Sequence, residues 1–417
     1  MLASLQDILD TVKSNTLTYQ QKLMCLGNIA ERLFDPRELL GYTDEEWQFL
    51  QNQMICDLNE GYAIYRPRYI LPDYNVYIEK GCKFLELPAP KNLDDVLDGL
   101  LILYSHVPSI TTFPVYIGRL DMLLDPFITD EEQDYIKIKR FLNHVDKTVP
   151  DSFCHANIGP YDTKAGRLIL KAVIELEAPT PNMTIRYDKS KTSREFAELA
   201  AKACLLVSKP SFANDAYYIS DLGDQYGIAS CYNALPECGG AYTLTRLRLG
   251  TIARACKTVD EMVNELLPRV AKCALSTMDK RHKFVVEESN FFNTSFLEKE
   301  GFIKRTNFTG MFAIVGLADA ANHLLQQEGL NETFGKSQRG DEIATLIMDK
   351  LKEVTDNHEG VYAERTGNRY LLHAQVGASN HEEDKRNAPA HRIRVGEEPT
   401  LLAHLKQSAP FHKYFPS

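Results

Sequence analysis

The chain has 417 residues, and its 44% hydrophobic and 25% charged residues are the composition of a globular protein with a substantial core. Its net charge of −10 supplies no field that would neutralise phosphates, which argues against non-specific binding to nucleic acids or anionic membranes. The nine cysteines are scattered without any CxxC pair, and we recognise neither a signal peptide nor an apolar run of roughly 20 residues, so the sequence predicts a reduced, cytoplasmic protein.

Residues 1–160 predict an N-terminal helical layer. Residues 1–60 have the pattern of helices joined by short turns, and residues 61–75 are rich in tyrosine and proline, which indicates an extended loop. Asn92 is a good N-cap for a helix that runs through Tyr104.

Residues 161–417 predict the core of an α/β fold. The expected strands are Met183–Tyr187, Tyr226–Ser230, Gly310–Val315, Gly360–Ala363 and Arg369–Val376. Capping boxes at Thr192 and Thr258 open helices between them. This alternation indicates a mainly parallel sheet, either a barrel or a wound sheet. Since no linker interrupts the chain, one continuous domain is an alternative to a boundary at residue 160.

The segment from His381 to Ser417 breaks this alternation. It is polar, contains prolines and shows no capped element, yet Phe411, Tyr414 and Phe415 cluster near its end. We therefore expect that the C-terminal part of the fold is missing from this sequence.

Cys231 is the candidate catalytic residue. It follows a short predicted strand and precedes Gly239 and Gly240, which we expect to close its loop, and the flanking Ser230 and Asn233 are polar. A lone cysteine is more often a small buried packing residue than a catalyst, and these flanks are what favour catalysis here.

The segment around Cys231 resembles the pyruvate formate-lyase class of glycyl radical enzymes. Pro181-Asn-Met-Thr-Ile-Arg resembles a strand of that family, and Asp224-Gln-Tyr-Gly-Ile-Ala-Ser-Cys-Tyr-Asn resembles the finger loop that carries its radical cysteine. Within the class, the YjjI-type branch is the best match, and Ile55-Cys-Asp-Leu-Asn-Glu-Gly61, Arg66-Pro-Arg-Tyr and His106-Val-Pro-Ser also fit that branch. The resemblance covers nearly the whole chain.

This resemblance implies a ten-stranded β/α barrel made of two parallel five-stranded halves with surrounding helices, and a finger loop near residues 226–240. It also implies a lyase-like mechanism of anaerobic metabolism, in which a radical SAM activase generates a glycyl radical and Cys231 becomes a thiyl radical. That thiyl would abstract a hydrogen atom from a small polar metabolite, with C–C or C–O cleavage. A homodimer without a metal or nucleotide cofactor is expected.

Two departures from the family narrow this chemistry. Ser230 stands where pyruvate formate-lyase has a second cysteine, and a serine is a much weaker nucleophile, which disfavours an acyl-cysteine intermediate. Cys231 is followed by Tyr-Asn-Ala rather than by the Val-Glu-Pro of the diol and choline branches, and the amide of Asn233 cannot titrate. Substrate binding is assigned to Ser230, Asn233, Asn214 and His373.

A third departure concerns the radical glycine. Arg394-Val-Gly-Glu-Glu398 lacks the spacer and the tyrosine of the glycyl signature, so we expect no radical glycine among these 417 residues. We favour a partial sequence as the explanation. The alternatives are a glycine supplied in trans, or a radical-inactive binding or regulatory relative on the same barrel.

Other polar residues offer weaker hypotheses. His373, His381 and His391 with Glu382 and Glu383 have no helical metal-ligand spacing and are expected to be surface residues. Cys231 with His373 or His391 would make a Cys–His hydrolase, which is the weakest hypothesis. We interpret Cys238 first as a packing residue and second as a redox accessory.

Overall fold

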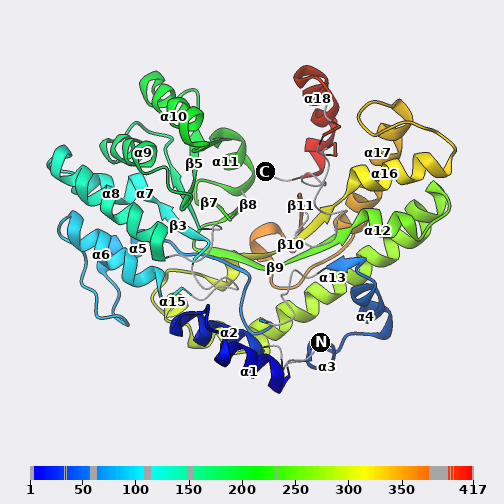
Figure 1. Ribbon diagram of the computed structural model, residues 1–417, viewed down its shortest axis with the longest axis horizontal. Helices are drawn as coiled ribbons and strands as arrows, with labels where there is room; N and C mark the ends of the chain where they lie inside the picture. Colours follow the sequence, from blue (N-terminus) through cyan, green and yellow to red (C-terminus); the bar gives the residue numbers. More distant parts are fainter. Residues whose placement is uncertain are drawn as a thin grey trace. The chain divides into compact units, whose positions relative to one another are not determined.

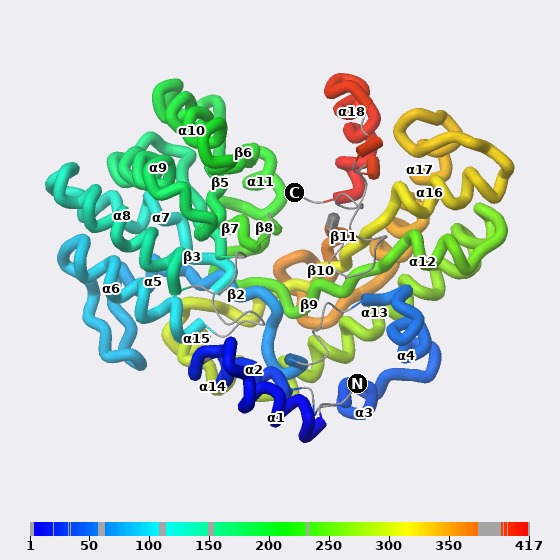
Figure 2. The backbone as a smooth tube through the Cα atoms, viewed as in Figure 1, coloured from blue at the N-terminus to red at the C-terminus, as the bar shows by residue number. Residues whose placement is uncertain are grey.

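The computed structural model describes residues 4–31, 33, 35–56, 63–107, 114–148, 154–230, 233–374, 393–394, 396–397 and 399–415 (Figures 1 and 2). The chain divides into two compact units. Unit 1 comprises Met1–Tyr65, Tyr242–Ser289 and Thr309–Pro416, and unit 2 comprises Arg66–Ala241, Asn290–Phe308 and Ser417. The predicted boundary at residue 160 lies inside unit 2, just after a strand.

Unit 1 is mainly helical around a sheet. Its helices are α1 (Leu5–Lys13), α2 (Tyr19–Glu31), α3 (Pro36–Leu39), α4 (Asp44–Gln51), α12 (Leu249–Arg254), η3 (Glu261–Leu266), α13 (Leu267–Lys283), η4 (Phe284–Glu288), α16 (Leu317–Gln327), α17 (Gln338–Asp356), η6 (Glu364–Thr366), α18 (Leu401–Ser408) and η8 (Ala409–Tyr414). Its sheet has the order β1 (Ile55–Cys56), β9 (Gly239–Arg248), β10 (Phe308–Val315) and β11 (Leu371–Ala374).

The core of unit 1 lies where α13, α16 and α17 cover this sheet. Phe312 and Ile314 of β10 pack in one apolar cluster with residues of all three helices. Strand β10 pairs in parallel with β11, which confirms a parallel component, whereas β1 pairs antiparallel with β9.

Unit 2 contains a four-stranded parallel sheet of β3 (Tyr116–Arg119), β4 (His155–Ile158), β5 (Asn182–Tyr187) and β6 (Ser211–Asn214). Its other strands are β2 (Tyr69–Leu71), which pairs with β9, and the hairpin strands β7 (Tyr226–Ala229) and β8 (Asn233–Pro236). Its helices are α5 (Asn75–Lys80), α6 (Leu93–Tyr104), α7 (Leu120–Leu124), η2 (Asp125–Phe127), α8 (Glu131–Thr148), α9 (Lys164–Leu176), α10 (Arg194–Val207), α11 (Asp215–Leu222), α14 (Phe291–Thr294), α15 (Phe296–Lys299) and η5 (Arg305–Asn307).

The parallel strands of unit 2 follow the order β3-β4-β5-β6, and β7 and β8 form a separate antiparallel hairpin. Figure 1 shows α8, α9 and α10 on one side of the parallel sheet and the hairpin on the other. The predicted α/β architecture with parallel strands is therefore confirmed, while the closure of ten strands into one barrel stays a prediction.

Several predicted elements match the structure closely. Strands β5, β7 and β10 occupy the expected segments, although Ser230 itself follows the end of β7. The side chain of Asn92 accepts a hydrogen bond from the Asp95 N–H and caps α6 as expected. The hydroxyl of Thr258 accepts from the Glu261 N–H, which confirms that cap as well.

Other predictions were wrong in detail. Strands β3 and β4 lie before residue 160, in the segment that we assigned to a helical layer. Ser193, not Thr192, caps α10, because the Ser193 hydroxyl accepts from the Phe196 N–H. Residues 360–363 contain a bend rather than a strand, and the segment after residue 381 contains α18 and η8 rather than loop alone.

The two glycines after the hairpin also have a different role from the predicted one. They do not close the cysteine loop but open β9, where Gly240 pairs with Ile70 of β2. A Cβ on Gly240 would lie 1.9 Å from the carbonyl oxygen of Tyr69, and one on Gly239 would lie 2.3 Å from that of Asn307. Only glycine fits so close a backbone approach.

Candidate functional site

The candidate cysteine belongs, by its sequence position, to the connection between the strands of the β7–β8 hairpin. Ala229 pairs with Asn233, so only residues 230–232 connect the two strands. Cys231 and Tyr232 lie outside the described residues, whereas Ser230 and Asn233 flank them, 2% and 1% exposed. The sequence therefore predicted the strand before Cys231 correctly, and in the hairpin Ser230 begins this connection while Asn233 follows it as the first residue of β8.

Ser230 adopts an unusual backbone conformation. Its φ is +54°, in the left-handed region that non-glycine residues rarely occupy. Such a conformation costs on the order of 1–3 kcal/mol and persists only where the surroundings hold it. The Ser230 N–H donates to the carbonyl oxygen of Val115, at 3.4 Å, which is one such restraint.

His155 supplies the second restraint on Ser230. Its Nδ1 lies 2.9 Å from the Ser230 carbonyl oxygen, and its Nε2 lies 2.7 Å from Oγ1 of Thr184 on the neighbouring strand β5. Burial lowers the pKa of this fully buried imidazole to about 4, so the ring is neutral at physiological pH. Because a carbonyl only accepts, Nδ1 carries the hydrogen, and Nε2 accepts from the Thr184 hydroxyl.

Asn157 anchors the hairpin two residues further along β4. Its Nδ2 donates to the Ile228 carbonyl at 2.9 Å, and the Ile228 N–H donates to its Oδ1 at 2.8 Å. The amide side chain thus takes the place of a neighbouring strand for β7. Since alternate residues of a strand point to the same face, His155 and Asn157 both face the hairpin.

Arg186 of β5 holds the start of β7. Its guanidinium carbon lies 3.9 Å from the centre of the Tyr226 ring, and its Nη1 lies 3.4 Å from the Tyr226 carbonyl oxygen. The Tyr226 hydroxyl and the Arg186 Nε both donate to Oδ1 of Asp215, at 2.8 and 2.7 Å. The cation, the anion and the ring therefore form one buried group at the base of the hairpin.

A buried carboxyl group lies just beyond the other strand of the hairpin. Glu237 follows β8, and its Oε1 accepts from the Tyr116 hydroxyl at 3.0 Å. Burial, with the nearby charge of Asp73, raises the pKa of Glu237 to about 7. The hydrogen bond of Tyr116 opposes that rise by favouring the carboxylate. The carboxyl group of Glu237 therefore gains or loses its proton near neutral pH.

The inward side chains of β3, β4 and β5 thus form a polar face under the hairpin. We define this polar face as Tyr116, His155, Asn157, Thr184 and Arg186. Four of them bond the hairpin or the residues that flank it, and Thr184 bonds His155. A buried parallel sheet usually presents apolar side chains on both faces, so five polar ones on one face mark a specific structural purpose.

This polar face was not predicted from the sequence. Its signal is the alternation of polar residues within otherwise apolar strands, at His155 and Asn157 in Cys154-His-Ala-Asn-Ile and at Thr184 and Arg186 in Met183-Thr-Ile-Arg. That pattern is typical of strands whose two faces differ.

The remaining candidate residues lie elsewhere. Asn214 is exposed, and its side-chain oxygen caps α11 by accepting from the Tyr217 N–H at 3.4 Å. His373 belongs to β11 of unit 1, where burial lowers its pKa to about 4. Cys238 is buried after β8, and burial together with the charge of Asp73 raises the pKa of its thiol to about 11. His381, His391, Glu382 and Glu383 lie outside the described residues.

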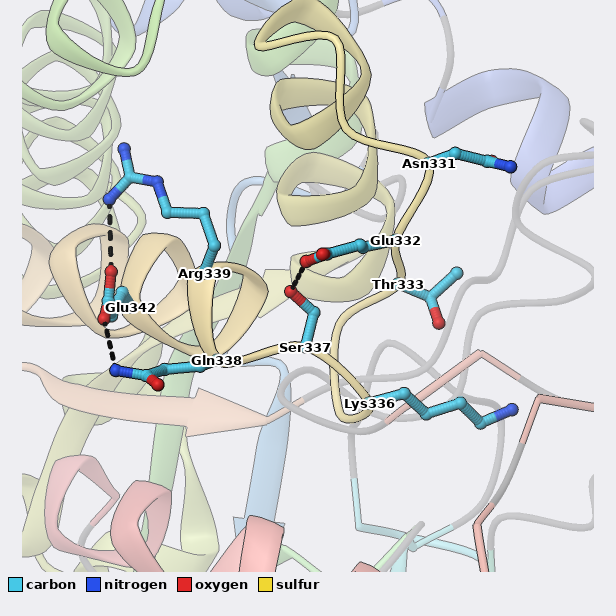
Figure 3. A pocket seen from close by; sticks show the side chains of 8 residues that line it. All are labelled: Asn331, Glu332, Thr333, Lys336, Ser337, Gln338, Arg339 and Glu342. Atoms are coloured by element: carbon cyan, nitrogen blue, oxygen red, sulfur yellow. Dashed lines mark hydrogen bonds and ion pairs between the residues drawn. The ribbon is translucent and has the colours of Figure 1, made fainter.

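Unit 1 contains an open depression around the start of α17 (Figure 3). The Ser337 hydroxyl bonds Glu332 and also accepts from the Gly340 N–H, which caps the helix. Arg339 pairs with Glu328 and Glu342. These contacts stabilise the helix start, and we assign no chemistry to this depression. Within the described ranges, no group of three or more His, Cys, Asp or Glu side chains is arranged to hold a metal ion, and no helix is long and apolar enough to cross a membrane.

Solved structures with a similar fold include an anaerobic ribonucleotide reductase and a dehydratase. The anaerobic ribonucleotide reductase of Thermotoga maritima, solved with citrate in its active site, matches 98% of this chain and 85% of its own at 12% identity, with a TM-score of 0.73. Hydroxyproline dehydratase from Clostridioides difficile, bound to trans-4-hydroxy-L-proline, matches 89% of this chain and 70% of its own at 11% identity, with a TM-score of 0.59. The chain therefore has the same α/β fold as these two proteins.

Two relatives are similar along nearly the whole sequence. An uncharacterised protein of Haemophilus influenzae is 92% identical over 417 residues, which are 100% of this chain and 81% of the relative. The uncharacterised protein YjjI of Escherichia coli K12 is 42% identical over 408 residues, 97% of this chain and 77% of the relative. The family model "Glycyl radical enzyme YjjI-like" matches residues 17–417, so the chain belongs to the YjjI-like glycyl radical enzyme family.

Proposed function

We propose that this chain is the body of an anaerobic glycyl radical enzyme in which Cys231 carries the working thiyl radical. The thiyl removes a hydrogen atom from a carbon of a small polar metabolite, forming the S–H bond and leaving a substrate radical. C–C or C–O cleavage of that radical follows, and the hydrogen atom is then returned, which regenerates the thiyl. This lyase-like reaction takes place in the cytoplasm.

The observation that carries the proposal is the anchorage of the hairpin. A three-residue connection contains Cys231, and the residue before it is held in a left-handed conformation by bonds to both of its peptide groups. These hydrogen bonds hold the backbone on one side of Cys231 in a fixed conformation. Such a restraint supports a role in which the neighbouring side chain must point in a fixed direction.

The residues at the tip suit a thiol that must stay protonated. Hydrogen-atom transfer requires an S–H bond, whereas a neighbouring cation would favour the thiolate. His155, whose pKa lies near 4, is neutral and supplies no such charge. The glycyl radical of this family would supply the one-electron oxidation of Cys231 when it is present.

Substrate contacts are proposed for four residues. Asn233 is the strongest candidate, because it is the first residue of β8 and lies two positions after Cys231. Its side-chain amide can donate a hydrogen bond to a substrate carbonyl or accept one from a substrate hydroxyl. Ser230 lies on the other side of Cys231. Asn214 and His373 are weaker candidates, because Asn214 caps α11 and His373 belongs to the other unit. The proposed protein partner is a radical SAM activase, and the proposed assembly is a homodimer.

Electron paramagnetic resonance on the complete protein tests this proposal. After anaerobic treatment with the activase, a glycyl radical with one α-hydrogen should give a doublet. In D2O the Cys231 thiol becomes S–D, and reversible transfer to the glycine should replace that hydrogen and collapse the doublet. Cys231→Ser should keep the doublet without exchange or turnover, because an O–H bond is too strong to give up its hydrogen.

Two results would contradict the proposal. Exchange or full turnover in Cys231→Ser would show that another group carries the radical. A protein that never acquires the doublet would instead support a radical-inactive binding or regulatory protein.

A further inference from the structure

We infer that His155, oriented by Thr184, is a positioning residue that fixes the direction in which the tip of the hairpin presents Cys231. This inference rests on the proposed function and adds a residue that acts through the backbone.

The covalent geometry of the peptide group links Ser230 to Cys231. The carbonyl of Ser230 and the N–H of Cys231 belong to one planar peptide unit. A hydrogen bond to that carbonyl from His155 Nδ1, at 2.9 Å, therefore restrains the rotation of the plane that leads to Cys231. The N–H of Ser230 bonds the Val115 carbonyl, so both peptide planes that flank Ser230 are restrained.

Thr184 orients the ring of His155. The Ser230 carbonyl only accepts, so Nδ1 carries the hydrogen, and the Thr184 hydroxyl donates to the opposite nitrogen, Nε2, at 2.7 Å. His155 and Thr184 are both buried side chains of neighbouring strands, β4 and β5. The pair is thus held by the rigid sheet rather than by a loop, which is the arrangement that precise positioning needs.

Unit 1 contains a matched pair of residues for comparison. His282 is also fully buried, and its Nε2 lies 3.1 Å from Oγ1 of Thr243 while its Nδ1 lies 3.2 Å from the Val361 carbonyl oxygen. Burial lowers its pKa to about 3. This pair has the same chemistry and burial but bonds a different segment, so Thr243→Val is a matched control for Thr184→Val.

The first measurement is the rate of deuterium exchange into the glycyl doublet, expressed per spin, in the complete activated protein. His155→Leu removes the donor to Ser230 and should slow exchange on the order of ten- to a hundredfold, since small misplacements of reacting atoms have effects of this size. His155→Asn keeps a donor near the position of Nδ1 and should restore exchange to within a few-fold of the wild type. Thr184→Val should give an intermediate rate.

Thr243→Val should lower the unfolding midpoint about as much as Thr184→Val while leaving the exchange rate per spin unchanged. If His155 only fills a hydrogen-bonding position in the core, neither threonine variant will change that rate. A wild-type rate of deuterium exchange in His155→Leu would overturn the inference. If His155→Leu does not fold, the same result in Thr184→Val would overturn it.

A second measurement does not depend on the radical. In the resting protein, the rate at which iodoacetamide alkylates Cys231 should rise severalfold in His155→Leu and remain near the wild-type value in His155→Asn and Thr243→Val. An equal rate in all variants would overturn the inference. Absence of the doublet in the wild type would refute the proposed function instead, and the alkylation rates would still decide the role of His155.

Discussion

The guanidinium of Arg186 and the carboxylate of Asp215 form an ion pair that is almost fully removed from solvent. The Nε of Arg186 lies 2.7 Å from Oδ1 of Asp215, and the side chains are 2% and 1% exposed. Although burial alone would raise the pKa of Asp215, the hydrogen bond and the charge of Arg186 outweigh it and lower that pKa below its ordinary value. The pair secures the base of the hairpin whose tip contains Cys231.

Asp215→Ala should strongly destabilise the protein. The change leaves the buried cation of Arg186 without its partner, and breaking a buried pair in this way costs about 3–5 kcal/mol. Chemical denaturation should show a clear fall in the unfolding midpoint. Glu198→Ala is the matched control, since its pair with Arg194 is exposed, at 87% and 63%, and its loss should leave the midpoint unchanged. Equal midpoints for the two variants would contradict this prediction.

Glu237 should make stability fall as the pH rises toward neutrality. Its pKa is raised from 4.5 to about 7 by burial, so between these values the folded protein binds more protons than the unfolded chain. The stability contributed by the protonated form is complete below pH 4.5 and is lost as the pH rises through 7. The loss is on the order of 3 kcal/mol at most, since one pKa unit corresponds to about 1.4 kcal/mol.

Glu237→Gln should remove this component of the pH dependence. Unfolding free energies at pH 5 and pH 8 should differ less in the variant than in the wild type. Tyr116→Phe is the control, because it keeps the titrating carboxyl but deletes the hydrogen bond that favours its charged form. It should therefore retain the fall and extend it to higher pH. An unchanged pH dependence in Glu237→Gln would show that other groups are responsible.

Asn233→Ala should separate substrate handling from radical transfer. The lost amide hydrogen bonds contribute on the order of 1 kcal/mol each, and more to a charged group, so turnover or binding should weaken roughly ten- to a hundredfold. Deuterium exchange into the glycyl doublet should continue, because the thiol is intact. Loss of exchange together with turnover would assign Asn233 to the radical transfer itself.

Cys238→Ala should keep both the doublet and its exchange. The thiol is buried, its pKa is raised to about 11, and its Sγ lies 3.7 Å from the Gly301 carbonyl oxygen, which are the properties of a packing residue. Anaerobic spectroscopy beside Cys231→Ser distinguishes the two cysteines. If the alanine variant lost exchange as the serine variant does, Cys238 would be a redox accessory.

The sequence predicted those parts of the fold that local patterns encode. β10 is a mainly apolar run of strand length, and the caps at Asn92 and Thr258 are short-range signals that depend on neighbouring residues only. The family followed from motifs spread along the chain, and the family model confirms it.

The missed features depend on residues that are distant in sequence. β4 is only four residues long and is buried on both faces, and its His and Asn interrupt the apolar pattern expected of a buried strand, so this segment was assigned to the helical layer. The bond between His155 and Ser230 joins residues 75 positions apart, and no local pattern reports such a contact. Thr192 failed as a cap because its hydroxyl accepts from the Asp188 N–H, which left Ser193 to begin α10.

The anchorage of β7 has a consequence for how this scaffold can change. Asn157 and His155 bond main-chain atoms of Ile228 and Ser230, and Arg186 bonds the main-chain carbonyl of Tyr226. Every residue presents the same main-chain carbonyl, whatever its side chain. Side chains at the tip can therefore be exchanged without loosening the hairpin, and a new reaction specificity can evolve there while the sheet beneath keeps the same five polar residues.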